Sequence, residues 1–278
     1  MNKIKISLLA AIGTISLAIS SYAQTVTAND GDVIMGFRTT GSPGNTLDLE
    51  VDLGSYMNFD LMNGATFTLT QLSPLDLSGT YGSSWHTRSD LDWSVAATSY
   101  NVGSDIGLPN NTYFVTSVNS GGTSTVFKRQ TSTLQLSVSQ NIDALAGGLT
   151  GEPSTANSNF AALITDSGNS YNTNISNGGS FTRPWNANST SLMTFGNVEN
   201  NANIPSGSYV ASDFYELLPT TSGTANAVDL GQFRLYDTGA LTFTAVSAVP
   251  EPATTSALLV GLGVIGYVMR RRASKAKG

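Results

Sequence analysis

Residues 81–93 hold the densest group of aromatic and ionisable side chains in the chain. This group includes the only histidine, His86, two of the three tryptophans, Trp85 and Trp93, and the acidic residues Asp90 and Asp92. Tryptophan rings pack against the C–H faces of sugars, and carboxylates accept hydrogen bonds from sugar hydroxyls. The pattern is consistent with a carbohydrate-contact site, and two carboxyls about 5–9 Å apart could support glycoside hydrolysis. The alternative is that both tryptophans are core residues.

A second acidic group follows one face of a predicted strand. In residues 47–53, Leu and Val alternate with Asp48, Glu50 and Asp52, and alternate residues of a strand share a face. Together with Asp30 and Asp32, these carboxylates are candidate calcium ligands, since calcium takes six to eight oxygens. We favour a solvated strand face instead, and we expect no other cofactor.

Composition excludes several common catalytic sites. The chain has no cysteine, which rules out a thiol nucleophile, a thiolate metal site and disulfides. A single histidine cannot build a typical zinc site, and no Gly-x-Ser-x-Gly sequence is present. We therefore predict that the protein is not an enzyme.

The elements that position these residues are predicted to be mostly strands, because apolar and polar residues alternate along much of the chain. Besides 47–53, the predicted strands are 33–39, 66–72, 93–100, 112–118, 133–139, 191–195, 207–215, 231–236 and 240–246. Short helices are predicted at 140–149 and 159–165. The Ser-, Asn- and Gly-rich residues 151–188 are predicted to be a long loop or a seam between subdomains. The fold class is therefore all-β, with an antiparallel β-sandwich or jelly-roll-like body.

The N-terminal segment has the features of an export signal. A basic start is followed by an apolar stretch at 6–19 and by small residues before a predicted cut between Ala23 and Gln24. This order is typical of a secretory signal peptide, here residues 1–23.

The last part of the chain combines an extended motif, an apolar stretch and a basic cluster. The motif is Val249, Pro250, Glu251 and Pro252, and the cluster is Arg270, Arg271 and Arg272. The 17 residues between them, 253–269, are mostly apolar and span about 25 Å as a helix, slightly less than the roughly 30 Å core of a bilayer. The arginines would keep the basic end, residues 273–278, in the cytoplasm. The segment is either a permanent single-pass transmembrane anchor or a signal that a membrane protease reads and removes.

This order of segments in residues 249–272 resembles the PEP-CTERM sorting domain. In that family the tail is thought to be recognised by exosortase, a membrane-embedded protease of Gram-negative bacteria that make exopolysaccharide. By this resemblance, the Val-Pro-Glu-Pro motif is the recognition element and the arginines set the topology. The body, residues 24–248, is also similar to surface proteins with this tail, in 30–38, 213–219 and 230–235.

The resemblance implies an exported protein that passes through an inner-membrane intermediate to the cell surface or extracellular matrix. Seven of the 13 Lys and Arg lie in the terminal segments, whereas only Glu251 of the 19 Asp and Glu does, so the body carries a net charge near −12. Such a surface excludes nucleic acid as a partner, because nucleic-acid binding depends on Lys and Arg. We predict a structural or adhesive role, with exosortase, exopolysaccharide and other matrix proteins as partners. The alternative is a carbohydrate-binding module or a weak glycoside-active enzyme acting on exopolysaccharide.

Overall fold

The structure is a computed structural model that describes residues 24–60, 63–102, 107–120, 123–124, 127, 129–166, 168–176, 198–221 and 225–247. The predicted signal peptide (1–23), the sorting tail (249–272), the basic end (273–278) and the predicted strand 191–195 lie outside the described residues. Of the predicted cleavage site, only Gln24 is described. Among the described helices, none has the length and hydropathy that a membrane span requires.

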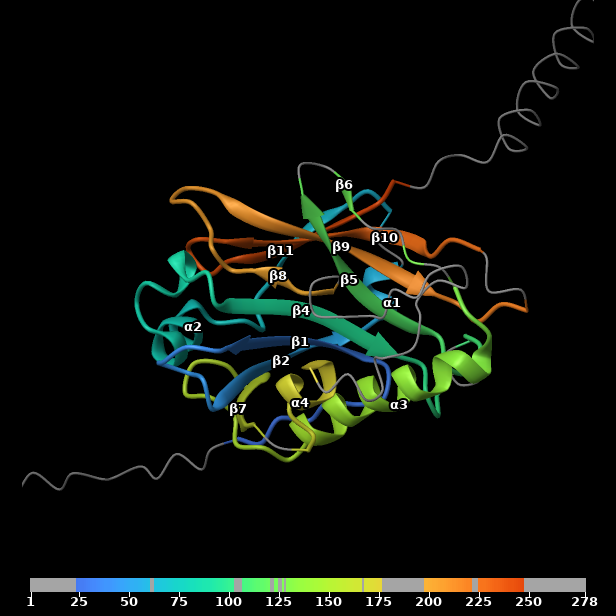
Figure 1. Cartoon of the computed structure of the whole chain (residues 1–278), viewed down its shortest axis with the longest axis horizontal. Helices are drawn as coiled ribbons and strands as arrows, with labels where there is room; N and C mark the ends of the chain where they lie inside the picture. The colour runs from blue at the N-terminus through green and yellow to red at the C-terminus, as the bar shows by residue number, and fades with distance from the viewer. Residues whose placement is uncertain are drawn as a thin grey trace, which may run out of the picture.

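The described strands form one antiparallel β-sheet (Figure 1). Its strands are β1 (Asp32–Thr39), β2 (Leu47–Ser55), β3 (Thr66–Leu69), β4 (Leu91–Thr98), β5 (Tyr113–Ser120), β6 (Thr123–Ser124), β7 (Ala161–Thr165), β8 (Asn200–Asn201), β9 (Tyr209–Leu217), β10 (Val228–Tyr236) and β11 (Leu241–Ala245). The strand order in space is β3-β11-β10-β9-β5-β4-β1-β2-β7, with β6 paired to β5 and β8 paired to β4. The last strand in sequence, β11, therefore lies between β10 and the early strand β3.

The helices are few and mostly short. They are α1 (Met57–Asp60), α2 (Pro74–Tyr81), the 3-10 helix η1 (Trp85–Thr87), α3 (Ser132–Leu149) and α4 (Tyr171–Ser176). Helix α2 begins at a clear signal: the Ser73 side chain accepts a hydrogen bond from the Leu75 N–H, and Pro74 takes the first helical position.

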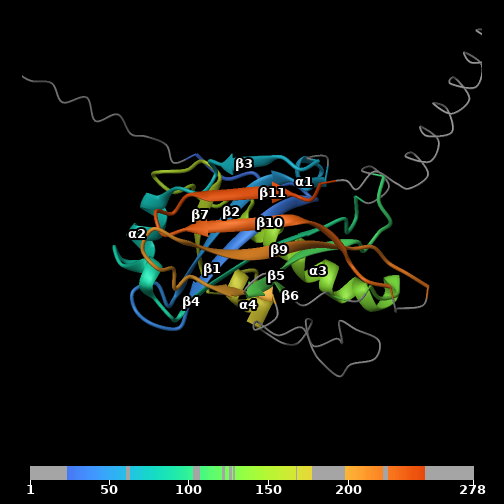
Figure 2. The same ribbon diagram turned by 90° about the horizontal axis from the view of Figure 1, so that it is seen from above.

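The sheet curls so that its two halves face each other across an aromatic core. In Figure 2, β9, β10 and β11 pass over β1, β2 and β4 at an angle. Phe59 of α1 fills the concave side, with its ring 5.2–6.1 Å from those of Phe67, Phe214, Phe233 and Phe243. All of these rings except Phe67 are fully buried. The aromatic cluster therefore ties α1 to strands from both ends of the described chain.

The convex side of the sheet is covered by α3 and α4. Helix α3 buries Val138, Ile142, Leu145 and Leu149 on this side, in one cluster with sheet residues such as Ile34. Figure 1 shows α3 and α4 side by side against β1, β2 and β7. The body thus has an inner core inside the curled sheet and a second core beneath the helices.

The predicted antiparallel β-rich body is confirmed, with two corrections to its architecture. Eight predicted strands overlap β1, β2, β3, β4, β5, β9, β10 and β11. A β-sandwich or jelly roll has two sheets, but here β5 pairs with both β4 and β9, so the halves remain one continuous sheet. The fold also contains an 18-residue helix, α3, so it is not purely all-β.

Two segments have the opposite structure from the one predicted. Residues 133–139 were predicted as a strand but belong to α3, because burial recurs at Gln135, Val138, Ser139 and Ile142 with helical spacing. Residues 159–165 were predicted as a helix but include β7, which pairs with β2. The predicted loop or seam at 151–188 therefore contains β7 and α4 in its described part.

Candidate functional site

The two tryptophans of the predicted carbohydrate site are core residues. Trp85 is 3% exposed and Trp93 is 0% exposed, and both belong to the inner core. The core alternative is therefore confirmed, and these two rings form no platform for a sugar. A hollow of about 410 Å³ does lie at this end of the body, lined by Ser42, Pro43, Tyr81, Gly82, Ser83, Ser84, Arg88 and Asp90.

Asp90 is held by Arg88 at the start of β4. The Arg88 Nε and Nη2 donate to Asp90 Oδ1 and Oδ2 at 2.9 and 2.7 Å. The same guanidinium donates to the carbonyl oxygens of Gly41 and Pro43 and to the Thr39 hydroxyl, at 2.6–2.8 Å. The hydrogen bonds that Asp90 accepts from Arg88, and one from the Thr39 hydroxyl, hold the pKa of Asp90 well below its usual range. The pair fastens the loop after β1 to the start of β4.

The other two predicted contact residues lie apart from this pair. Asp92 accepts a hydrogen bond from Asn201 Nδ2 at 2.9 Å, and its Oδ2 is 3.8 Å from Arg38 Nη2. His86 Nδ1 lies 3.5 Å from the carbonyl oxygen of Ile204. Since Trp93 faces the inner core and its neighbour Asp92 the opposite side of β4, the structure does not gather the five predicted residues around one space.

The acidic face of β2 is buried, which corrects the predicted solvated face. Asp48, Glu50 and Asp52 are at most 5% exposed. Glu50 Oε1 accepts the backbone N–H of Tyr171 at 2.6 Å, and Asp48 Oδ2 accepts that of Asn172 at 2.7 Å. The alternation of residues 47–53 was interpreted correctly, but α4 lies against Asp48 and Glu50 on the face that alternation alone assigns to water.

Burial makes ionisation of these carboxyls costly. It raises the pKa of Asp48 and of Asp52 to about 6 each, and that of Glu50 well above its usual value. Backbone N–H donors only partly offset the loss of water around Asp48 and Glu50. The carboxyl groups that accept the first N–H groups of α4, those of Asp48 and Glu50, therefore have raised pKa values.

A polar network that was not predicted completes the support of α4. The Tyr171 hydroxyl is 2.7 Å from Glu199 Oε1 and 2.6 Å from Ser94 Oγ. Arg38 donates from Nε and Nη2 to the same Glu199 carboxylate at 2.7–3.2 Å. The network links α4 to β1, β4 and the segment before β8. No local pattern signals it, because its members lie up to 161 residues apart.

The candidate calcium ligands are not grouped as a metal site. Asp32 Oδ2 accepts hydrogen bonds from the backbone and side chain of Asn29 at 2.7 and 3.1 Å, and Asp30 is exposed. Within the described ranges, no three His, Asp or Glu residues are placed to hold a metal ion. A cation at this place would require oxygen ligands beyond these residues.

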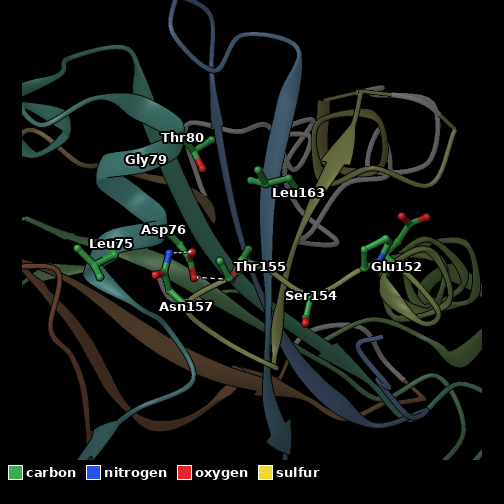
Figure 3. Close-up of a pocket in the computed structure, with 11 residues that line it drawn as sticks. Leu75, Asp76, Gly79, Thr80, Glu152, Ser154, Thr155, Asn157 and Leu163 are labelled. Atoms are coloured by element: carbon green, nitrogen blue, oxygen red, sulfur yellow. Dashed lines mark hydrogen bonds between the residues drawn. The ribbon is translucent and has the colours of Figure 1, made fainter. Parts of the chain in front are cut away.

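A larger open pocket lies between α2 and the segment that leads into β7 (Figure 3). Its volume is about 490 Å³, and it is lined by Leu75, Asp76, Gly79, Thr80, Glu152, Pro153, Ser154, Thr155, Ala156, Asn157 and Leu163. We call it the α2–β7 pocket.

The floor of the α2–β7 pocket is built around a buried carboxylate. Asp76 is 5% exposed; its Oδ2 accepts from Thr155 Oγ1 at 2.7 Å and its Oδ1 from Asn157 Nδ2 at 2.8 Å. Thr155 Oγ1 also accepts the Ser158 N–H at 3.1 Å, which fixes the turn. Ser158 Oγ in turn donates to the carbonyl oxygen of Gln71 at 2.5 Å. The polar side chains at the floor are therefore held in one arrangement.

None of the pocket residues was singled out from the sequence. Ser73 before Pro74 could have indicated a helix start near Asp76. Its partners, Thr155 and Asn157, lie 79 and 81 residues away, so no local pattern connects them to it.

Comparison with known proteins finds one match. The family model of the PEP-CTERM protein-sorting motif matches residues 248–272, which confirms the resemblance seen in residues 249–272. No curated protein and no solved structure matches the chain.

Proposed function

We propose that the chain, which carries a PEP-CTERM protein-sorting motif at residues 248–272, is an exported target of exosortase and serves as a non-catalytic structural or adhesive protein of the bacterial surface or extracellular matrix. In this proposal, a Gram-negative host exports the chain by its signal peptide. The tail holds the chain briefly at the inner membrane, and exosortase then cuts the tail near Pro250–Pro252.

The observation that carries the proposal is the position of the motif relative to the body. β11 ends at Ala245, and Val246 is still bonded: its N–H donates to the carbonyl oxygen of Leu230 at 3.0 Å, and its own carbonyl accepts the Gly64 N–H at 3.1 Å. The matched motif begins two residues later, at residue 248. A cut within the motif would therefore release a body that keeps every described strand and helix.

The surroundings of the residues predicted to contact sugar favour a structural role for them over a glycoside-active site. Trp85 and Trp93 are buried, and Asp90 is paired with Arg88 to hold a loop. A glycoside-active site centred on these residues would need them open to substrate. Their present bonds stabilise the body instead.

The test is the C-terminal peptide of the protein in its native host, identified by mass spectrometry in membrane and extracellular fractions. We expect an extracellular chain that ends near residues 249–252. Replacing Pro250, Glu251 and Pro252 with alanine should leave the tail attached and the protein in the membrane. The matched control replaces Thr254, Thr255 and Ser256, three polar residues that follow the Val-Pro-Glu-Pro sequence, and should be processed normally. Normal processing of the first variant would refute the recognition role of the motif.

A further inference from the structure

We propose that the α2–β7 pocket is a binding subsite for a neutral saccharide, such as a segment of the host's own exopolysaccharide. The proposal rests on the proposed function for the source of the ligand, since an exported protein meets polysaccharide. The binding itself is a property of the folded body.

The size and shape of the pocket fit a small polar ligand. Its volume of about 490 Å³ falls within the range of about 300–1,000 Å³ that is usual for small-molecule sites. The pocket is open to solvent rather than an enclosed cavity. Figure 3 shows Asp76, Thr155 and Asn157 together between Leu75 and Leu163.

The pocket presents hydrogen-bonding groups that the protein does not use itself. The hydroxyls of Thr80 and Ser154 and the carboxamide oxygen of Asn157 make no hydrogen bond within the described part of the chain. Each oxygen of the Asp76 carboxylate accepts one bond there, and a carboxylate oxygen can accept two. Hydroxyl, carboxamide and carboxylate groups of this kind can hydrogen-bond the hydroxyls of a sugar ring.

The charge of the pocket selects against anionic ligands. Its ionisable lining residues are Asp76 and Glu152, and none of the described lining residues is Lys or Arg. A uronate or a phosphate would therefore meet repulsion without a counterion, whereas a neutral sugar would not.

The walls of the pocket supply apolar surface. Leu75 is 64% exposed and Leu163 is 40% exposed, so both side chains remain available to a ligand. The C–H groups of a pyranose can pack on such side chains, while its hydroxyls face Asp76 and Asn157. The combination of two apolar walls and a fixed polar floor distinguishes this pocket from the hollow at Arg88 and Asp90, where the charged groups are paired with each other.

Gly79 offers a way to block the pocket without disturbing the fold. It lies on α2, lines the pocket, and a Cβ added there would meet no atom within 4 Å. Gly147 on α3 is a matched control, because an added Cβ there also meets nothing within 4 Å and the residue lies outside the pocket. Leucine favours a helix more than glycine does, so neither Gly79→Leu nor Gly147→Leu should lower stability.

The experiment measures binding to the exported protein purified from its host, processed or not, by isothermal titration and saturation-transfer NMR. The probes are cellohexaose, mannohexaose and chitohexaose as neutral oligosaccharides, and hexagalacturonate as an anionic one. We expect at least one neutral probe to bind and hexagalacturonate not to bind. Gly79→Leu should weaken binding by about tenfold or more, which is about 1.4 kcal/mol, and Gly147→Leu should leave it unchanged.

Three results would overturn the proposal: no binding of any neutral probe, binding that Gly79→Leu does not weaken, or equal binding of hexagalacturonate. None of these results depends on how the tail is processed, so a failure of binding and a failure of sorting can be told apart.

Discussion

The buried acid Asp48 should make the body less stable as the pH rises. Its pKa is about 6 in the folded state, against 3.8 for a free side chain, because burial disfavours the carboxylate. The folded state thus binds more protons than the unfolded state between about pH 4 and 6. Stability is full below the unfolded pKa and is lost as the pH rises through the folded pKa.

The size of this loss follows from the difference between the two pKa values. A rise from 3.8 to about 6 corresponds to about 3 kcal/mol of unfolding free energy by pH 8, about half of it above pH 5. An asparagine in place of Asp48 would keep an oxygen for the Asn172 N–H but could not ionise. Asp48→Asn should therefore be at least as stable as the natural protein at pH 8, and its stability should change less with pH by about 3 kcal/mol.

The assay is urea unfolding of the purified protein at steps between pH 4 and 8, followed by tryptophan fluorescence. Gly147→Ala is the control, because an added Cβ there meets no atom within 4 Å and the change involves no ionisable group, so it should leave the pH dependence unchanged. If Asp48→Asn were less stable than the natural protein at pH 8 but equal to it at pH 4, Asp48 would stabilise the fold as an anion, and the reasoning would be refuted.

Two further predictions concern the close packing at Gly36 and the hydrogen bonds of Arg88. A Cβ on Gly36 would collide with the Tyr171 ring, so Gly36→Ala should lower the free energy of unfolding by about 3 kcal/mol in a thermal or urea melt. Gly147→Ala is the control and should not destabilise the protein. Equal stability of the two variants would contradict this packing. A lysine at position 88 cannot keep the two bonds to Asp90 together with those to Gly41 and Pro43. Arg88→Lys should therefore lower the free energy of unfolding by about 2 kcal/mol. An unchanged melt would show that the hydrogen bonds of Arg88 add nothing to stability.

The strands could be predicted where one face packs on a core, because apolar and polar residues then alternate along the sequence. Residues 47–53 show this, since Leu49 and Val51 do face the inner core as β2. Residues 133–139 show the failure: Leu134, Leu136 and Val138 alternate like a strand, but burial continues to Ile142, Leu145 and Leu149 with helical spacing. The window that suggested a strand was too short to include that second period.

The sorting motif could be predicted because its recognition depends on contiguous residues. The α2–β7 pocket and the Arg38–Glu199–Tyr171 network could not, because each joins side chains far apart in sequence. The same reason explains why the sequence left Trp85 and Trp93 open between a sugar site and the core, and why it placed Asp48 on a solvated face. Their residue types suited a surface site, and only the placement of distant segments shows that other parts of the chain cover them.

The position of β11 has a consequence for the timing of folding. Phe243 of β11 packs against Phe59, Phe67, Phe214 and Phe233, and β11 is the strand to which β3 is bonded. In a chain exported from its N-terminus, the aromatic core cannot close until residues 241–245 have emerged, and contacts over such sequence distances form slowly. The sorting motif follows immediately, so with the membrane retention that we propose for the tail, the chain would be held there while the body completes its fold. Retention by the tail would then protect an open sheet, with its unpaired edges and apolar rings, from meeting other copies before it closes.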